Sequence, residues 1–168
     1  MITFMRDRAK ASNSPTVATV GTISFEPNAI NVIPSRAIFT LDLRDPIEER
    51  LKEEETALEE FLHQLEKEED VTIDVERLAR FEPVKFERKI VELIERKASA
   101  RGYSHKRMTS GAGHDAQMMA RIAPTAMIFV PSIGGISHNP KEFTPEQYLI
   151  AGANVLLDVV RSLSERAQ

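Results

Sequence analysis

The chain has 168 residues, of which 42% are hydrophobic and 29% charged, so it can form one ordinary domain or two small ones and is not disordered. A formal net charge of −4, with basic residues interleaved among glutamates, argues against a nucleic-acid partner. We expect a cytoplasmic protein with no membrane contact, disulfide or thiolate metal site. The reasons are that no apolar run approaches the roughly 20 residues that cross a bilayer, residues 1–14 lack the apolar centre of a signal peptide, and there is no cysteine.

Two strands are predicted at the start of the chain. Residues 16–25 are rich in Val, Thr and Ile, and residues 36–44 alternate between apolar and polar side chains. The segment between them, residues 26–35, contains two prolines and two asparagines, which suit a turn and an irregular link. We therefore predict a hairpin with a long connection.

A helix and a third strand are predicted next. Apolar residues recur at helical spacing from Pro46 to Lys67 among many Glu and Lys, so this helix should bury one stripe. Val71, Ile73 and Val75 then alternate with polar residues, as in a strand. The order strand, strand, helix, strand predicts an α+β sheet with one face covered by helix.

The pattern changes near Pro83, where we place a domain boundary. An amphipathic helix is predicted around residues 90–98, followed by a short helix at about 114–121. The apolar run 126–130 is typical of a buried, parallel strand. Thr144 as the N-cap and Pro145 at the first helical position are expected to open a long helix that ends near Glu165. Residues 84–168 are therefore predicted to be α/β.

Two segments of the second half contain candidate functional residues. Residues 110–115, Ser-Gly-Ala-Gly-His-Asp, place two glycines before a helix, which suits either anion binding or a plain tight turn with Asp115 at the helix dipole. His138 follows the predicted strand 126–130, at the edge where α/β sheets bind ligands. A metal site needs about three to four protein ligands, so spacing alone favours an ordinary loop histidine.

Asn31 and Arg44 flank the second predicted strand. An amide that donates and accepts, together with a guanidinium that grips a carboxylate, could hold an amino-acid-like ligand. The alternative is that Asn31 organises the turn and that Arg44 pairs with Asp42 or Asp45.

Four short motifs occur in a fixed order along the chain. They are Asn-Val-Ile-Pro at 31–34, Asp-Leu-Arg at 42–44, Ser-Gly-Ala-Gly-His-Asp-Ala at 110–116 and Gly-Gly-Ile-Ser-His-Asn-Pro at 134–140. This combination resembles the M20-type metal-dependent amidohydrolases of the hydantoinase/carbamoylase family, which act on allantoate and N-carbamoyl-L-amino acids. The resemblance runs from about Thr16 to the C-terminus, and the last two motifs are specific to this group among related metallopeptidases.

The resemblance implies a division of the chain into two parts. Residues 1–83 would be the later part of an α+β lid, ferredoxin-like but incomplete, which mediates dimerisation and closes over the substrate. Residues 84–168 would be an α/β segment of a two-metal, aminopeptidase-like catalytic domain that binds zinc or manganese. On the matching positions, His138 looks like a metal ligand, Asn31 and Arg44 look like lid residues that bind the substrate carboxylate, and Gly113 and His114 are similar to a substrate-side turn.

The chain also departs from the family pattern. The family's other metal ligands (a His, an Asp, a Glu and a second His) and its general-base Glu correspond to positions before Met1. With one remaining ligand, neither metal ion would be held, so we expect negligible hydrolase activity from this chain by itself. We also expect a homodimer through residues 1–83, because an exposed sheet edge favours pairing with another chain.

Two main interpretations stay open, beside a third and weaker one, a folded remnant that binds no ligand. In the first, the chain is part of a hydrolase whose missing ligands come from elsewhere, for example from a separate N-terminal half chain. Metal-bound hydroxide would then attack the carbamoyl or amide carbon while Arg44 orients the substrate carboxylate. In the second, the chain is a non-catalytic dimerisation or small-carboxylate-binding module derived from that family. Allantoate, ureidoglycolate-like compounds and N-carbamoyl amino acids fit the motifs equally well.

Overall fold

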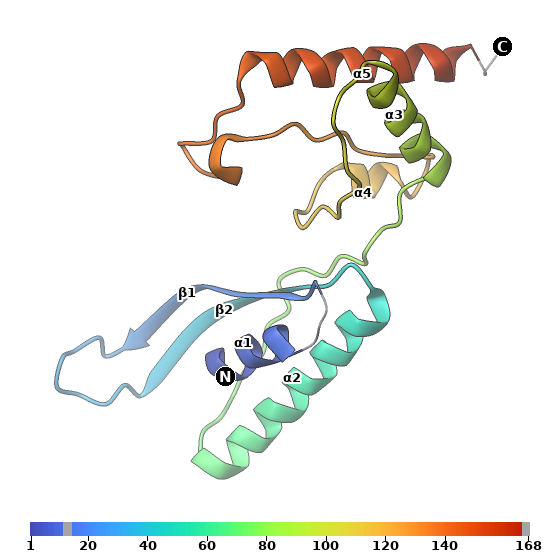
Figure 1. The fold of residues 1–168 in the computed structure, drawn as a ribbon. Coiled ribbons are helices and arrows are strands. Elements are labelled where there is room, and N and C mark those ends of the chain that lie inside the picture. The colour runs from blue at the N-terminus through green and yellow to red at the C-terminus, as the bar shows by residue number, and fades with distance from the viewer. Residues whose placement is uncertain (12–14, 166–168) are drawn as a thin grey trace. The chain divides into compact units, whose positions relative to one another are not determined.

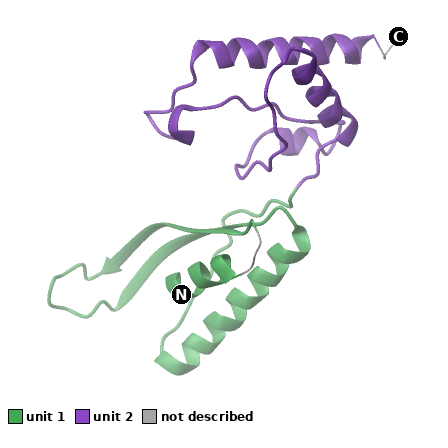
Figure 2. Ribbon diagram, viewed as in Figure 1, with its two compact units in different colours: residues 1–83 green, residues 84–168 purple. Residues whose placement is uncertain are grey.

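A computed structural model describes residues 1–11 and 15–165 of the chain. The chain divides into two compact units, residues 1–83 and residues 84–168 (Figure 2). No helix in the described ranges is both long and apolar enough to cross a bilayer.

Unit 1 is built on a hairpin of two long antiparallel strands (Figure 1). β1 (Val17–Glu26) pairs with β2 (Arg36–Arg44), in a register that runs from Val17 opposite Arg44 to Glu26 opposite Arg36. Both predicted strands are confirmed to within one residue, and residues 27–35 form the connecting loop. This register places Glu26 and Arg36 beside the loop, and Val17 and Arg44 at the opposite end of the hairpin.

Two helices complete unit 1. α1 (Ile2–Ala11) contacts β1, and α2 (Glu48–Glu69) matches the helix predicted from Pro46 to Lys67. Phe4 of α1 stacks on Phe61 of α2 with ring centroids 4.1 Å apart, while Arg8 donates from Nε to Glu54 Oε2 at 2.6 Å. A stacked aromatic pair and a charged hydrogen bond therefore fasten α1 to α2.

The segment after α2 is not the strand that the alternation predicts. Residues 71–75 have no regular secondary structure, and the unit 1 sheet contains only β1 and β2 among the described residues. An alternating pattern makes a segment fit for a sheet face, but a strand forms only where a neighbouring backbone accepts its hydrogen bonds. Here the Ile73 N–H donates instead to the Glu66 carboxylate of α2 at 2.8 Å.

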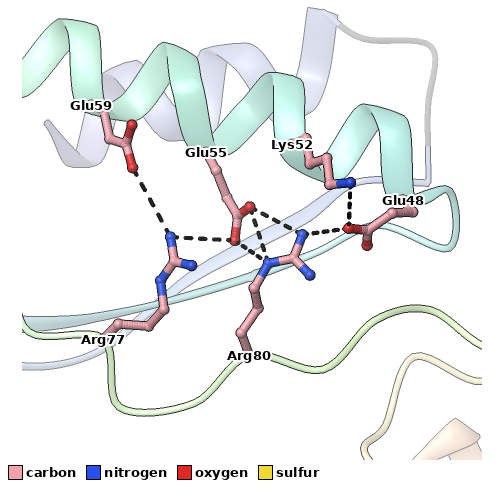
Figure 3. A network of polar contacts seen from close by, with 6 residues as sticks. All are labelled: Glu48, Lys52, Glu55, Glu59, Arg77 and Arg80. Atoms are coloured by element: carbon pink, nitrogen blue, oxygen red, sulfur yellow. Dashed lines mark hydrogen bonds and ion pairs between the residues drawn. The ribbon is translucent and has the colours of Figure 1, made fainter.

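Two arginines, Arg77 and Arg80, hold the segment that follows α2 against that helix (Figure 3). Arg80 donates from Nε to both oxygens of Glu55, at 2.9 and 3.2 Å, and from Nη2 to Glu48 Oε1 at 2.7 Å. These hydrogen bonds, first those with Glu55 and then that with Glu48, raise the pKa of Arg80 above its ordinary value. Arg77 adds longer contacts of 3.9 Å to Glu55 and 4.0 Å to Glu59.

Unit 2 is organised around two helices. α3 (Arg88–Ala100) packs on α5 (Glu146–Ser164), and both confirm predicted helices. The shared core consists of four buried residues with three half-buried neighbours: Leu93, Ala98, Val155 and Val159, then Ile94, Tyr103 and Ile128. Two short elements lie between these helices along the chain, α4 (Ala116–Met119) and the 3₁₀ helix η1 (Ile133–Gly135).

The predicted strand at residues 126–130 is absent from the described residues of unit 2, so the expected α/β character is not observed there. No backbone hydrogen bond joins this run to another described segment. Ile128 packs on the helical core, whereas the Phe129 residue is 49% exposed. The run has the side chains of a buried strand, but the described residues provide no neighbouring strand to pair with it.

Two helix starts also differ from the prediction. α4 begins at Ala116 rather than near His114, and α5 begins at Glu146. Pro145 itself occupies the N-cap position of α5 without a side-chain cap, so the expected cap by Thr144 is wrong. The Pro145 carbonyl accepts the first helical hydrogen bonds, from the Tyr148 and Leu149 amides.

Candidate functional site

In unit 1, β2 presents a carboxylate and a guanidinium on one face. Asp42 and Arg44 are two residues apart on a strand, so their side chains project to the same side. Arg44 donates from Nε to Asp42 Oδ1 at 2.8 Å and from Nη2 to Asp42 Oδ2. This two-point contact defines the plane of the guanidinium relative to the strand.

The neighbouring acid, Asp45, has a different role. Asp45 is buried, accepts a hydrogen bond from Thr16 Oγ1 at 2.6 Å and accepts one from the Ile47 amide at 2.7 Å. It thereby fastens the start of α2 to the residue before β1. The sequence leaves two candidate partners for Arg44, Asp42 and Asp45. In the structure, Arg44 pairs with Asp42.

The pairing changes the acidity of both groups. The hydrogen bond from Arg44 holds the pKa of Asp42 below its ordinary value, and the same bond raises the pKa of Arg44. Each side chain is about half exposed, at 48% and 49%, so water screens the attraction and the pair remains accessible to a solute.

Asn31 lies in the loop that joins β1 to β2, at the end of the hairpin opposite Arg44. Its side chain has no hydrogen-bond partner within the described part of the chain, so the turn is not organised by this amide. The loop is closed instead by Ser35, whose amide donates to the Glu26 carbonyl at 2.8 Å. Apolar side chains flank Asn31, with Ile30 fully exposed and Ile33 90% exposed.

The hairpin separates the two predicted carboxylate-binding residues. Arg36 and Arg44 are eight steps apart along an extended strand, which corresponds to about 26 Å, and Asn31 lies beyond Arg36. An N-carbamoyl amino acid is only as long as two or three residues, about 7–10 Å. A single ligand of this size therefore cannot touch Asn31 and Arg44 of the same copy of the hairpin.

In unit 2, the residues before α4 form a compact turn. His114 Nδ1 accepts a hydrogen bond from the Ala116 amide at 3.0 Å, so a neutral His114 carries its proton on Nε2. The His114 amide and the Gln117 side chain approach at 3.4 Å. Asp115 makes no side-chain cap, and the imidazole caps α4 in its place. Gly113 precedes this turn, and a β-carbon added there would lie 4.0 Å from Gln117 Oε1.

His138 occupies a loop with left-handed backbone. Its φ is +56°, and Gly134 and Gly135 before it have φ of +66° and +67°. Histidine tolerates this conformation better than most residues, and here its amide donates to Glu142 Oε2 at 2.8 Å. The imidazole itself is exposed. A non-glycine residue held at positive φ is a feature that often accompanies functional loops.

The donor set does not fit a two-metal centre within this chain alone. No group of three or more His, Asp or Glu side chains that could bind a metal ion occurs among residues 1–11 and 15–165. A single histidine such as His138 could offer at most one ligand, whereas a zinc ion takes three or four.

Two contacts near the candidate residues could hardly be predicted from the sequence. The Thr16 to Asp45 bond joins residues 29 positions apart, and nothing local predicts it. The contact of Glu142 with the His138 amide follows a four-residue spacing that also occurs in many surface loops.

Known proteins resemble this chain over most of its length. Residues 3–162 match peptidase family M20/M25/M40. The chain is 38% identical over 149 residues to the N-carbamoyl-L-amino-acid amidohydrolase of Rhizobium meliloti, covering 89% of this chain and 36% of that protein. It is 37% identical over 150 residues to the allantoate amidohydrolase of Escherichia coli (strain K12), covering 89% and 36%.

A solved structure shows a similar fold. The crystal structure of an amidase of the hydantoinase/carbamoylase family from Burkholderia multivorans matches with a TM-score of 0.84 and 38% identity, over 91% of this chain and 38% of that one. The chain thus spans little more than a third of the length of these proteins.

Proposed function

Because this chain belongs to peptidase family M20/M25/M40, we propose that it supplies the carboxylate-binding lid and one metal ligand of a metal-dependent amidohydrolase. The reaction would be hydrolysis of a carbamoyl or ureido C–N bond in allantoate or in an N-carbamoyl-L-amino acid. The relatives whose names specify these substrates support the reaction class. The proposed role of the chain rests on Arg44, whose accessible guanidinium is held in a defined plane on β2.

Arg44 would bind the substrate carboxylate. A guanidinium presents parallel N–H donors that match the two oxygens of a carboxylate, and N-carbamoyl amino acids and allantoate both contain this group. Asn31 would bind another polar part of the substrate through its amide, which both donates and accepts. Its exposed position in the hairpin loop is compatible with contact to a ligand.

The length of the hairpin supports a complete site that would use two copies of the chain. A ligand of about 7–10 Å cannot reach from Arg44 to Asn31 of the same hairpin, which is longer by more than a factor of two. We propose a homodimer through residues 1–83 in which each site takes Arg44 from one copy and Asn31 from the other. The apolar residues beside Asn31 would be covered in such a dimer.

Unit 2 would contribute to the reaction centre. His138 would provide one metal ligand, and Gly113 with His114 would form a turn beside the substrate. The remaining ligands would come from other parts of the enzyme, for example a separate chain. A metal bound by one protein ligand is not retained, so we expect no turnover from the 168-residue chain by itself.

Calorimetric titration with an N-carbamoyl-L-amino acid tests the proposal. We expect binding that Arg44→Ala abolishes and that Arg36→Ala preserves. Arg36 is a matched control, because it is an exposed arginine on the same strand whose nearest carboxylate, Glu26, lies 3.9 Å away. Binding that survives Arg44→Ala would disprove the assignment of the carboxylate site.

A reconstitution separates the hydrolase from the alternative, a non-catalytic small-carboxylate-binding module. The chain is mixed with a polypeptide comprising the rest of a relative, which contains the other metal ligands, and with zinc or manganese. Turnover that His138→Ala removes supports the hydrolase. Carboxylate binding without turnover in that mixture supports the module.

A further inference from the structure

We propose that Asp42 is a positioning residue, which holds the Arg44 guanidinium in the orientation that receives a carboxylate. The inference rests on the proposed function, because it concerns the residue that would bind the substrate. Asp42 itself touches no substrate in this proposal and acts only through Arg44.

The geometry of the pair carries the proposal. Asp42 takes hydrogen bonds from two nitrogens of Arg44, Nε and Nη2, and not from a single terminal nitrogen. A contact through Nε constrains the last rotatable bond before the guanidinium, whereas a contact through one terminal nitrogen leaves the group free to swing. Both residues belong to β2, whose backbone is fixed by its pairing with β1.

The described contacts of Asp42 give it no other structural role. Its side chain is about half exposed, so it supports no buried core, and the connection to α2 is secured by Asp45. An exposed arginine without such a partner samples many rotamers, and a ligand must stop that motion when it binds. A partner on the same strand removes part of this cost before the ligand arrives.

An alternative role for Asp42, competition with the substrate for Arg44, predicts the opposite effect on ligand binding. If the Asp42 carboxylate occupied Arg44 in place of the substrate, its removal would expose the guanidinium and tighten binding. The side-on contact favours the positioning role, because a guanidinium has five N–H donors and Asp42 engages two of them. The contact with Asp42 therefore does not by itself engage every N–H donor of Arg44.

Titration of an N-carbamoyl-L-amino acid into variants of the full chain tests the role. We expect Asp42→Ala to weaken binding about tenfold and Asp42→Asn, which keeps one acceptor oxygen, to lie between Asp42→Ala and the unchanged chain. Glu26→Ala is the matched control, since it removes the other ion pair of the hairpin, and it should leave binding unchanged. Equal or tighter binding by Asp42→Ala overturns the proposal.

A second measurement needs no ligand. The Nε–H of Arg44, observed by ¹⁵N relaxation, should be ordered in the unchanged chain and mobile in Asp42→Ala, with the thermal midpoint of the chain preserved. An equally ordered Nε–H in Asp42→Ala overturns the positioning role. If the unchanged chain does not bind the ligand, or if Arg44→Ala binds equally well, the proposed function fails, while relaxation still decides how Asp42 acts on Arg44.

Discussion

Gly152 of α5 lies directly against Val130: a β-carbon added at Gly152 would be 2.5 Å from Val130 Cγ1. Real carbon atoms do not approach so closely, and the branched Val130 side chain has little freedom to move away. The absence of a side chain at position 152 is therefore what allows the apolar run 126–130 to pack on α5.

We predict that Gly152→Ala destabilises the chain. Helix propensity alone would stabilise it by roughly 1 kcal/mol, but overpacking against Val130 costs about 1–3 kcal/mol, so the clash should dominate. Urea unfolding measures the difference. Val130→Ala in the same chain should restore much of the lost stability, and Gly111→Ala, where an added carbon meets nothing within 4 Å, should be neutral. A stabilised Gly152→Ala would show that the contact relaxes freely.

Arg80 is predicted to hold the segment after α2 in place. Arg80→Ala removes short contacts to Glu48 and Glu55, and it leaves two neighbouring carboxylates without their main cation. We expect the thermal midpoint to fall by about 4 °C or more. Arg77→Ala, which loses only contacts of 3.9 and 4.0 Å, should shift the midpoint by much less. Equal effects of the two variants would contradict a specific role of Arg80.

The ion pair between Arg101 and Asp158 should make stability depend on pH. Arg101 donates to Asp158 at 2.6 and 3.0 Å, and this holds the pKa of Asp158 below its ordinary value. The stabilisation is present above the pKa of an unfolded Asp, about 3.9, and is lost as the pH falls through the lower pKa of the folded state.

Thermal midpoints from pH 7 to pH 2 test this dependence. The difference between the unchanged chain and Asp158→Asn should be constant near neutral pH and should shrink below about pH 4. Asp115→Asn is the control in the same unit, because Asp115 makes no side-chain cap to α4. A difference that stays constant down to the lowest pH would contradict the assignment.

Mixing two inactive variants tests the proposed site between copies of the chain. Neither Asn31→Ala nor Arg44→Ala should bind an N-carbamoyl amino acid as a homodimer, since every site lacks one residue. A mixed dimer should contain one site with both residues intact and one site lacking both. We therefore expect about half of the binding capacity of the unchanged dimer within the heterodimer fraction. No recovery in an isolated heterodimer would contradict a site built from Arg44 of one copy and Asn31 of the other.

Local patterns predict the helices and the hairpin well. The apolar periodicity of residues 46–67 corresponds to α2, the alternation of residues 36–44 corresponds to β2, and the helices α3 and α5 occur where they are predicted. In each case the hydrogen bonds are within the element or with a strand close in sequence, so the residues themselves contain the required information. The four motifs likewise identify the family, because they need only order and spacing.

Other features depend on partners that are distant in sequence. Residues 71–75 and 126–130 have the composition of strands, yet a strand exists only where another backbone lies beside it, and the described residues supply none. Arg44 pairs with Asp42 and not with Asp45 because Asp45 binds Thr16, which is 29 residues away in the chain.

The sequence by itself determined the helices, the hairpin and the family of this protein, because periodicity and motif spacing are properties of neighbouring residues. Only the tertiary structure decided that Arg44 pairs with Asp42 and that residues 126–130 form no strand. Both outcomes depend on groups that are distant in the chain: Thr16 binds Asp45, and no described backbone lies beside residues 126–130 to exchange hydrogen bonds with them.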